Sequence, residues 1–228
     1  MVTLEYHQSA KSMGSKSQAS RAPAPFGGAT KRTLDVLISL VALIWLAPVM
    51  LAIALAVKVQ DGGPVLYFQP RVGRNGQDFR LLKFRTMVVD GAALLDWLIR
   101  NDPEAAREWR EKQKLTNDPR VTFVGGFLRR SSLDELPQLL NVFLGQMSIV
   151  GPRPMLRHQV EAYGSAYELY CSARPGITGL WQVSGRSETT FRYRSELDAV
   201  YLQRWNAYSD FILMLRTFDV VLQQRGAC

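Results

Sequence analysis

An uncharged stretch of 22 residues, Val36–Val57, constrains the fold of this chain more than any other feature. Nearly all of its side chains are apolar, and a helix of about 20 such residues crosses the roughly 30 Å hydrocarbon core of a bilayer. Two features argue against a simple span. Pro48 lies near the middle, where it removes a helix hydrogen bond and bends the axis. Cationic residues flank both ends, with Lys31 and Arg32 before the stretch and Lys58, Arg71 and Arg74 after it.

The proline and the flanking cations together favour a helix that enters the membrane and returns. The positive-inside tendency would place both flanks in the cytoplasm. Each half around Pro48 has about 12 residues or fewer, or roughly 18 Å at 1.5 Å per residue, which is too short to cross. A helix–break–helix over residues 31–59 satisfies these conditions. On physical grounds alone, this re-entrant arrangement and a kinked span remain equally open.

Composition limits what the rest of the chain can be. Of the 228 residues, 47% are hydrophobic and 21% are charged, so most of the chain can bury a core and is not intrinsically disordered. The exception is residues 1–30, which we expect to form a disordered tail. They lack the apolar segment of a secretory signal, so the mature chain should keep them. Residues 60–228 are then expected to form one cytosolic domain.

The charge balance indicates an anionic partner. A formal net charge of +8 suits nucleic acid, an acidic membrane surface or phosphorylated substrates, without distinguishing among them. The two cysteines, Cys171 and Cys228, are too few and too distant for a disulfide framework. With only two histidines, a histidine-rich zinc site is nearly excluded.

Local patterns predict a mainly helical α+β domain with a small β-hairpin. Val65–Gln69 and Asp78–Arg85 are strand-like and flank Gly73–Gly76, where Asn-Gly is a strong turn signal. Residues 90–115 have a helical pattern. A final helix is expected from about Asp210, apolar on one side and preceded by aromatic residues, as is typical of amphipathic helices at a membrane–water interface.

Four segments unusually rich in Arg, Gly and Pro could carry chemistry. Gly and Pro fix the path of the backbone, and arginine is suited to bidentate contact with phosphate. Four rigid turns that each present a cation would form a pocket for a polyanion if they converge. These segments are Lys83–Met87, Arg129–Pro137, Ser148–Pro154 and Arg174–Arg186.

Asp134 and Glu135 form the only adjacent acidic pair in the chain. One interpretation is helix capping, because Ser132 and Glu135 have the spacing of a capping box, or because Asp134 itself is the N-cap with Pro137 inside the first turn. The other is catalytic: one carboxylate could attack a phosphorus atom while its neighbour holds a divalent metal. The residues alone favour capping.

Longer blocks carry a resemblance to a known family. From Lys31 to the C-terminus, the chain resembles the bacterial sugar transferase family of monotopic phosphoglycosyl transferases. Within it, the chain is most similar to the transferases that start rhizobial exopolysaccharide repeat units with galactose 1-phosphate. The blocks are KRTLDVLISL, DGGPVLYFQPRVGRNGQDFRLLKFRTM, LRRSSLDELPQLLNVFLGQMSIVGPRP and RPGITGLWQVSGR.

The resemblance implies a reaction. A sugar 1-phosphate, of galactose or glucose, moves from a UDP-sugar to undecaprenyl phosphate, and UMP is released. Asp134 matches the nucleophile and Glu135 the residue that binds Mg²⁺, so residues 60–228 would be the catalytic domain. Pro48 matches the membrane helix break, although Ala47 replaces the serine often found before it, which leaves the kink geometry open. The implied substrate-binding residues are Lys83, Arg85, Arg129, Arg153, Arg186 and Asp198.

The resemblance also implies a location and partners. The enzyme would lie at the cytoplasmic face of the bacterial inner membrane, in contact with its lipids, with no nucleic-acid partner and with a homo-oligomer left open. Two other classes share some of these features. A membrane-attached nucleic-acid-binding protein should have a basic helix or a basic patch with interleaved aromatic residues, which we do not find. A non-catalytic membrane scaffold would not need Asp134 and Glu135 among arginines. The motifs address phosphates, so they do not identify the sugar.

Overall fold

The computed structural model describes residues 26–112, 114–184 and 191–222, and it confirms the expected α+β class. The expected tail, residues 1–30, lies mostly outside the described residues. Short 3₁₀ turns, which include Arg74–Gly76, Leu133–Glu135 and Arg157–Gln159, connect some of the longer elements. These elements are α1 (Gly28–Asp61), β1 (Leu66–Val72), β2 (Asp78–Phe84), α2 (Gly91–Asn101), α3 (Pro103–Lys112), α4 (Phe123–Ser131), α5 (Gln138–Phe143), β3 (Ser148–Val150), α6 (Val160–Tyr163), α7 (Ala166–Ser172), β4 (Gly176–Thr178), α8 (Leu180–Val183), α9 (Phe191–Gln203) and α10 (Ala207–Leu222).

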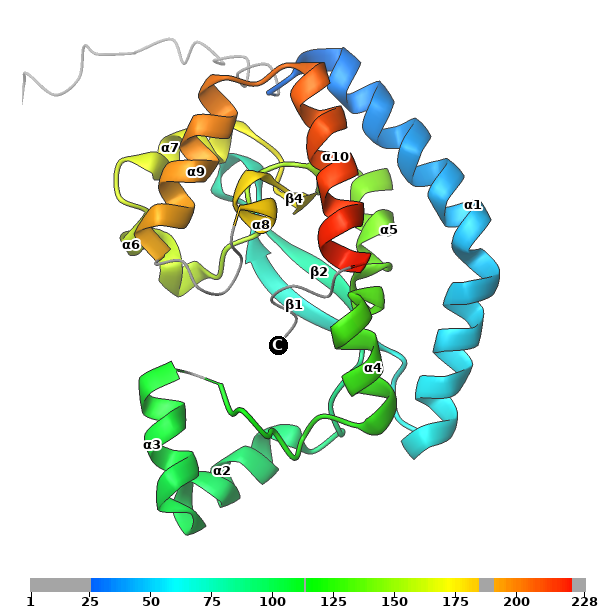
Figure 1. Cartoon of the computed structure of the whole chain (residues 1–228), viewed down its shortest axis with the longest axis vertical. Helices are drawn as coiled ribbons and strands as arrows, with labels where there is room; N and C mark the ends of the chain where they lie inside the picture. Colours follow the sequence, from blue (N-terminus) through cyan, green and yellow to red (C-terminus); the bar gives the residue numbers. More distant parts are fainter. Residues whose placement is uncertain (1–25, 113, 185–190, 223–228) are drawn as a thin grey trace, which may run out of the picture.

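Helix α1 differs in one respect from the expected helix–break–helix. It continues through Pro48 as a single helix of 34 residues, and Figure 1 shows its axis curving along its length. Proline removes one hydrogen bond of the helix, and the flanking Ala- and Leu-rich turns keep theirs, so a bend can replace a break. The helix ends where Gly62 adopts a left-handed conformation (φ 69°) and its N–H bonds to the carbonyl of Lys58. Within the described residues, α1 is the helix with the length and apolar composition to cross a membrane.

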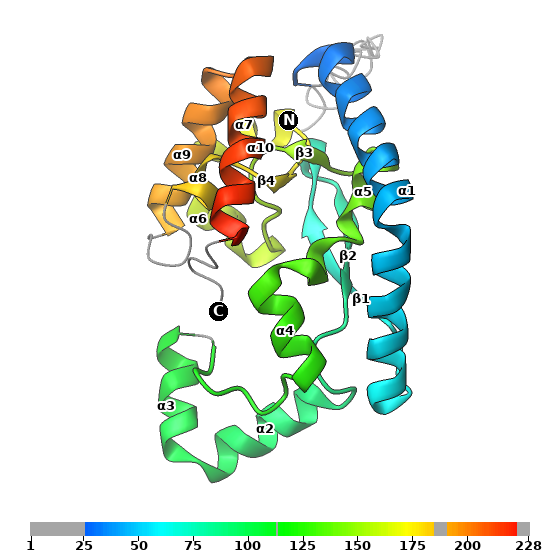
Figure 2. The same ribbon diagram turned by 45° about the vertical axis from the view of Figure 1, so that its right-hand side comes forward.

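Both ends of α1 are bound to the same folded domain, and its middle is exposed. Near the N-terminus, Lys31 and Asp35 are buried and contact α10 and β3. Near the C-terminus, Ile53 and Val57 pack with Phe84 and Leu128 in a hydrophobic cluster. Figure 2 shows α1 along one side of the molecule, next to α5. Its large apolar side chains that are more than half exposed are Leu37, Val41, Ile44, Trp45, Leu51, Leu55 and Val59.

The predicted hairpin is confirmed. Strands β1 and β2 pair antiparallel from Leu66–Phe84 to Val72–Asp78. In the turn, Asn75 and Gly76 both have positive φ (59° and 71°), a conformation that explains the Asn-Gly signal. The second strand ends at Phe84, one residue earlier than expected.

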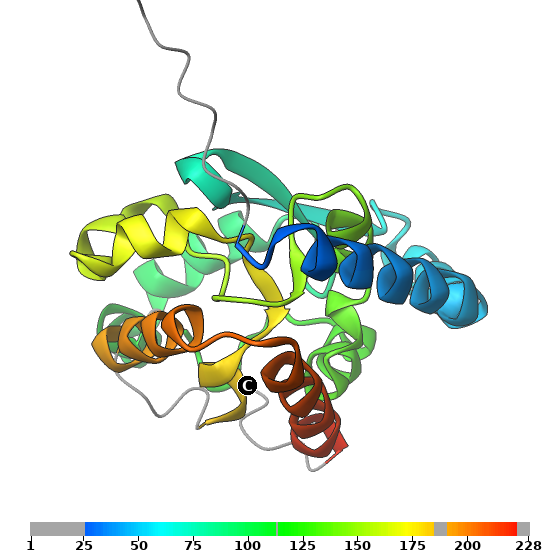
Figure 3. The same cartoon turned by 90° about the horizontal axis from the view of Figure 1, so that it is seen from above.

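A second, parallel pair of strands was not predicted. Strands β3 and β4 have three residues each and align Ser148 with Gly176 and Val150 with Thr178. The backbones approach so closely beyond β3 that a Cβ on Gly176 would lie 2.1 Å from the amide nitrogen of Gly151. This contact brings two of the Arg/Gly/Pro segments together. In the view from above, β4 lies between the hairpin on one side and α9 and α10 on the other (Figure 3).

The segment expected to be helical, residues 90–115, forms two helices that project from the body (Figure 1). They separate at Asp102, whose carboxylate accepts a hydrogen bond from the N–H of Glu104 (2.9 Å) as α3 begins with Pro103. At the other end of the chain, α10 begins at Ala207, three residues earlier than expected. Its exposed apolar residues, including Phe211, Leu215 and Phe218, agree with the predicted amphipathic pattern.

Candidate active site

The acidic pair lies in the 3₁₀ turn Leu133–Glu135, between α4 and α5. The capping interpretation is wrong: the side chain of Ser132 makes no capping hydrogen bond, and Asp134 accepts a hydrogen bond from Lys83 instead of a backbone N–H of α5. Ser132 has a left-handed conformation (φ 57°), so the chain turns sharply just before the pair. The turn directs the carboxylate of Asp134 toward the hairpin.

Lys83, on β2, bridges the two carboxylates. Its Nζ lies 3.3 Å from Oδ2 of Asp134 and 2.7 Å from Oε1 of Glu135. Burial raises the pKa of Asp134 above its ordinary value, and the charge of Lys83 only partly offsets this effect. A carboxylate that is costly to keep charged is a stronger base than an exposed one, and therefore a better nucleophile when it is ionised.

Arg129, on α4, is a second cation near Asp134, and its charge also favours the ionised carboxylate. The Nε of Arg129 donates to the hydroxyl of Thr86 (2.9 Å), which follows β2. The two Arg/Gly/Pro segments that carry Lys83 and Arg129 therefore meet at the acidic pair, as the sequence analysis required for a polyanion site.

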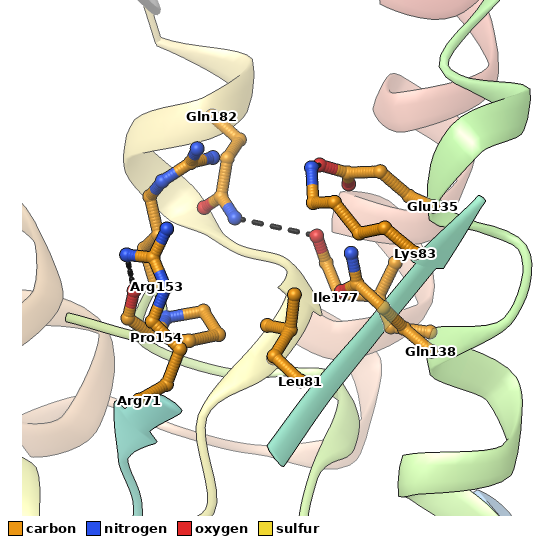
Figure 4. Close-up of a pocket in the computed structure, with 10 residues that line it drawn as sticks. Arg71, Leu81, Lys83, Glu135, Gln138, Arg153, Pro154, Ile177 and Gln182 are labelled. Carbon is orange, nitrogen blue, oxygen red and sulfur yellow. Dashed lines mark hydrogen bonds and ion pairs between the residues drawn. The ribbon is translucent and has the colours of Figure 1, made fainter. Parts of the chain in front are cut away.

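Arg153 and Arg71 form the opposite wall of the pocket, facing Lys83 and Glu135 (Figure 4). The guanidinium of Arg153 lies over the ring of Trp181, 5.2 Å from its centroid. Arg71 donates to the carbonyl of Pro154 (2.9 Å) and to the side-chain oxygen of Gln69 (2.7 Å). The space between the walls is partly open to solvent.

Arg71 and the glutamines of this pocket were not predicted from the sequence as site residues. Arg71 was counted only among the cations that follow the apolar stretch. The register of the hairpin could have identified Arg71. Arg71 pairs with Phe79, and Tyr67 pairs with Lys83. Because side chains alternate along a strand, Arg71 and Lys83 lie on the same face of the hairpin. Two glutamine amides, of Gln138 and Gln182, also line the pocket.

The whole described site lies in a region that matches a known family. The family model for bacterial sugar transferases matches residues 26–224. The chain belongs to this family. This confirms the resemblance and the enzyme class drawn from the sequence motifs.

Curated relatives of this transferase are similar over most of its length. It is 48% identical to the exopolysaccharide production protein ExoY of Sinorhizobium fredii over 203 residues. The aligned region covers 89% of this chain and 90% of that protein. It is 45% identical to an undecaprenyl-phosphate galactose phosphotransferase of Salmonella typhimurium, over 86% of this chain and 41% of that longer protein. It is 40% identical to a UDP-glucose:undecaprenyl-phosphate glucose-1-phosphate transferase of Klebsiella pneumoniae, over 82% of this chain and 39% of that protein.

Two of the expected substrate-binding residues of the transferase have other surroundings. Arg85 does not line the pocket; it is buried and forms an ion pair with Asp61 at the end of α1. Asp198 is also buried, and its Oδ2 accepts a hydrogen bond from the hydroxyl of Tyr163 (2.5 Å). Burial raises the pKa of Asp198 to about 7, although Tyr163 and the nearby Arg153 act in the opposite direction. Asp198 therefore supports the loop of Arg153 through a backbone hydrogen bond. It does not line the pocket where a substrate would bind.

The remaining expected residue, Arg186, lies outside the described residues. Of the set named from the sequence, the structure places Lys83 and Glu135 on one wall of the pocket and Arg153 on the other. Asp134 contacts Lys83, and Arg129 lies near Asp134, but neither of them lines the pocket.

Proposed function

We propose that this sugar transferase moves a sugar 1-phosphate from a UDP-sugar to undecaprenyl phosphate and releases UMP, as an early membrane step of exopolysaccharide synthesis. The observation that carries the proposal is a pocket with Lys83 and Glu135 on one wall and two arginines on the other, in which the same Lys83 also contacts Asp134. The relatives named above for galactose and glucose transfer make UDP-galactose and UDP-glucose the donors to test first.

The reaction divides into two displacements at the same phosphorus atom. In the first, an oxygen of Asp134 bonds to the β-phosphorus of the donor, and the bond from that phosphorus to the bridging oxygen breaks. The electron pair stays on the oxygen, which leaves with UMP. In the second, an oxygen of the lipid phosphate bonds to the phosphorus and the carboxylate of Asp134 is regenerated. A direct reaction would instead bring two polyanions together in one step.

Cations of the pocket supply electrostatic stabilisation for both displacements. Lys83 reaches both carboxylates in the absence of substrate and can bond to a phosphoryl oxygen once one is present. Arg129 is held by Thr86 next to Asp134, and Arg153 is held by the ring of Trp181 across the pocket. Each cation is therefore positioned before the substrate arrives, which reduces the cost of reorganisation during the reaction.

Glu135 supplies a carboxylate of the kind that binds Mg²⁺. The described residues contain no group of three side chains that could enclose a metal ion. Mg²⁺ does not need one, because it commonly binds through one or two carboxylates, water and substrate phosphates. When bound, the ion would neutralise charge on the departing UMP. Glu135 would hold it only after the ammonium of Lys83 moves from Oε1.

A re-entrant α1 and a cytoplasmic location belong to the same proposal. Lys31 at one end of α1 and Asp61 at the other form ion pairs with one folded domain. A helix that crossed the bilayer would separate its ends by a hydrocarbon core of roughly 30 Å. The contacts at both ends therefore favour a single side, where a nucleotide sugar from the cytosol and a lipid phosphate at the bilayer surface can meet.

The decisive experiment is mass spectrometry of the enzyme mixed with UDP-galactose or UDP-glucose and Mg²⁺, without lipid acceptor. We expect a sugar-phosphate adduct on the peptide that contains Asp134 and about one equivalent of UMP per active enzyme. Asp134→Asn should fold and form no adduct, whereas Asp96→Asn, at an exposed position of α2, should behave as the wild type. Near-normal turnover in Asp134→Asn would refute the nucleophile.

A further inference from the structure

A single side chain pairs with the edge of strand β2 that faces away from β1. In the described part of the chain this sheet has two strands, so β1 covers one edge of β2 and the other edge is left to a different partner. The partner is Asn141, on α5. Its Oδ1 accepts a hydrogen bond from the N–H of Leu82 (3.0 Å), and its Nδ2 donates to the carbonyl of Arg80 (2.8 Å). The carboxamide thus bonds to β2 as a peptide group of a further strand would.

The side chain of Asn141 is enclosed, and its orientation is fixed. It is 1% exposed, and its Nδ2 donates a second time, to Oε1 of Gln146 (2.6 Å). Because a backbone N–H can only donate and a carbonyl can only accept, the two bonds to β2 determine which way the amide points. An apolar residue at this position would leave both backbone groups of β2 without these partners, at a cost in free energy.

The two elements that Asn141 joins carry the two parts of the acidic site. Lys83 follows Leu82 on β2, and the turn that holds Asp134 and Glu135 precedes α5. Lys83 reaches both carboxylates at once, with its Nζ 3.3 Å from Asp134 and 2.7 Å from Glu135. These two short distances require β2 to lie at one particular position along α5.

Apolar packing alone does not define that position. Leu81, Val142 and Met147 form a buried cluster that also holds β2 against the α5 segment. Hydrophobic contacts are non-directional, so they favour close packing without fixing the strand along its own axis. Hydrogen bonds weaken steeply when their angles are distorted, so the two bonds of Asn141 do fix it.

We propose that Asn141 is a positioning residue, which holds β2 against α5 so that the ammonium of Lys83 lies between the carboxylates of Asp134 and Glu135. This inference rests on the proposed function. Asn141 is buried and does not line the pocket that the described residues form, so it acts through Lys83 and not by contact with a substrate.

The test separates a positioning effect from a loss of folded protein. Full-length enzyme in detergent is mixed with saturating UDP-galactose or UDP-glucose and Mg²⁺, without lipid acceptor. The adduct on the peptide that contains Asp134 is then followed with time by mass spectrometry. Its amplitude reports the fraction of enzyme that is folded and active, whereas its first-order rate constant reports the chemistry within that fraction. A merely structural role of Asn141 would lower the amplitude alone.

Asn141→Ser is the first variant, because serine is too short to reach both groups of β2 and leaves room for a water molecule that can bond to them. We expect the rate constant to fall by about 10- to 100-fold with most of the amplitude retained, as for a displacement of about 1 Å next to a reacting group. The matched control is Asn101→Ser, at an exposed position of α2 where Nδ2 donates to the carbonyl of Trp97 (2.7 Å). Its rate constant should equal that of the wild type.

A second background tests whether Asn141 acts through Lys83. In Lys83→Gln, the further substitution Asn141→Ser should cause little additional loss of rate, because no ammonium remains to be positioned. Equal fold-losses in the two backgrounds would overturn the proposal. An unchanged rate constant in folded Asn141→Ser, or a loss of amplitude alone, would do the same.

A milder variant covers the case in which Asn141→Ser does not fold. Gln146→Ala changes an exposed side chain and removes only the third hydrogen bond of the Asn141 amide. It should lower the rate constant about 2-fold or more, and an unchanged rate constant would again overturn the positioning role. Absence of an adduct in the wild type with either donor is a different result, because it would refute the proposed function itself.

Discussion

The ion pair between Lys31 and Asp210 gives a quantitative test of how α1 is attached to the domain. The Nζ of Lys31 lies 2.5 Å from Oδ2 of Asp210, and the two side chains are only 8% and 14% exposed. Asp210 also accepts hydrogen bonds from the hydroxyl of Tyr201 (2.7 Å) and from Nε1 of Trp205 (3.0 Å). The pair therefore joins the start of α1 to the start of α10 across 179 residues of sequence.

Removing both partners should cost less than the sum of the costs of removing each alone. Loss of one member of a buried pair leaves an uncompensated charge and typically costs about 3–5 kcal/mol. Lys31→Met should lie near the lower end, about 3 kcal/mol, because Tyr201 and Trp205 still solvate the carboxylate. Asp210→Asn should cost about as much, since Lys31 then loses its ion pair and keeps the ring of Trp205, 5.9 Å away, and the charge of Asp35. In Lys31→Met/Asp210→Asn neither charge remains, so the total should fall short of the sum by about 2 kcal/mol.

Thermal unfolding in a mild detergent, followed by circular dichroism, measures these differences. For a chain of this length, 3 kcal/mol corresponds to a decrease in Tm of roughly 6–12 °C. The matched control is Arg192→Met, which breaks an exposed pair with Glu196 whose side chains are 89% and 58% exposed; it should change stability by no more than about 0.5 kcal/mol. Strictly additive effects of the two single substitutions would refute the argument, because they would mean that the buried charges do not interact.

Three further predictions concern topology, catalysis and pH. Tags at the N-terminus and after Lys58 should both be cytoplasmic in a protease-accessibility assay, and Pro48→Leu should favour a full span; tags on opposite sides would exclude re-entry. Arg153→Ala should lower kcat/KM about 10-fold or more relative to Arg107→Ala, and equal activities would remove Arg153 from the phosphate site. Asp198 has a pKa of about 7 in the folded state and 3.8 in the unfolded state. The free energy of unfolding should therefore fall as the pH rises from about 4 to 7, by up to about 1.4 kcal/mol per pH unit. Asp198→Asn should flatten the dependence of Tm on pH between 4 and 7, and an unchanged slope would show that Asp198 does not titrate there.

Those parts of the site that depend on local signals could be predicted from sequence. The Asn-Gly turn identified the hairpin, since few residues other than Asn and Gly tolerate the positive φ that Asn75 and Gly76 adopt. The acidic pair was recognised because its members are adjacent in sequence and follow arginines. In each case the residues that act together lie within a few positions of one another.

The burial of single residues and the pairing of residues distant in sequence could not be predicted from local sequence patterns. Strands β3 and β4 have three residues each, too few to show an alternating pattern, yet their pairing brings Gly151 against Gly176 and orients Arg153. Asp198 lies on a helix whose apolar residues are not segregated to one face, so nothing in its neighbourhood indicated that it would be buried. Arg85 was assigned to the substrate because it shares a motif with Lys83, and its pairing with Asp61 depends on where α1 ends.

That pairing connects α1 to the acidic pair. Lys83 is on β2, and Arg85 follows it by two residues, so one short segment carries both the cation of the acidic pair and the residue that holds the end of α1. At the other end of α1, Lys31 and Asp35 are bound to α10 and β3, and β3 leads directly to the loop of Arg153. The two walls of the pocket are thus each linked to one end of the same helix. A displacement of α1 would therefore act on both walls of the pocket together.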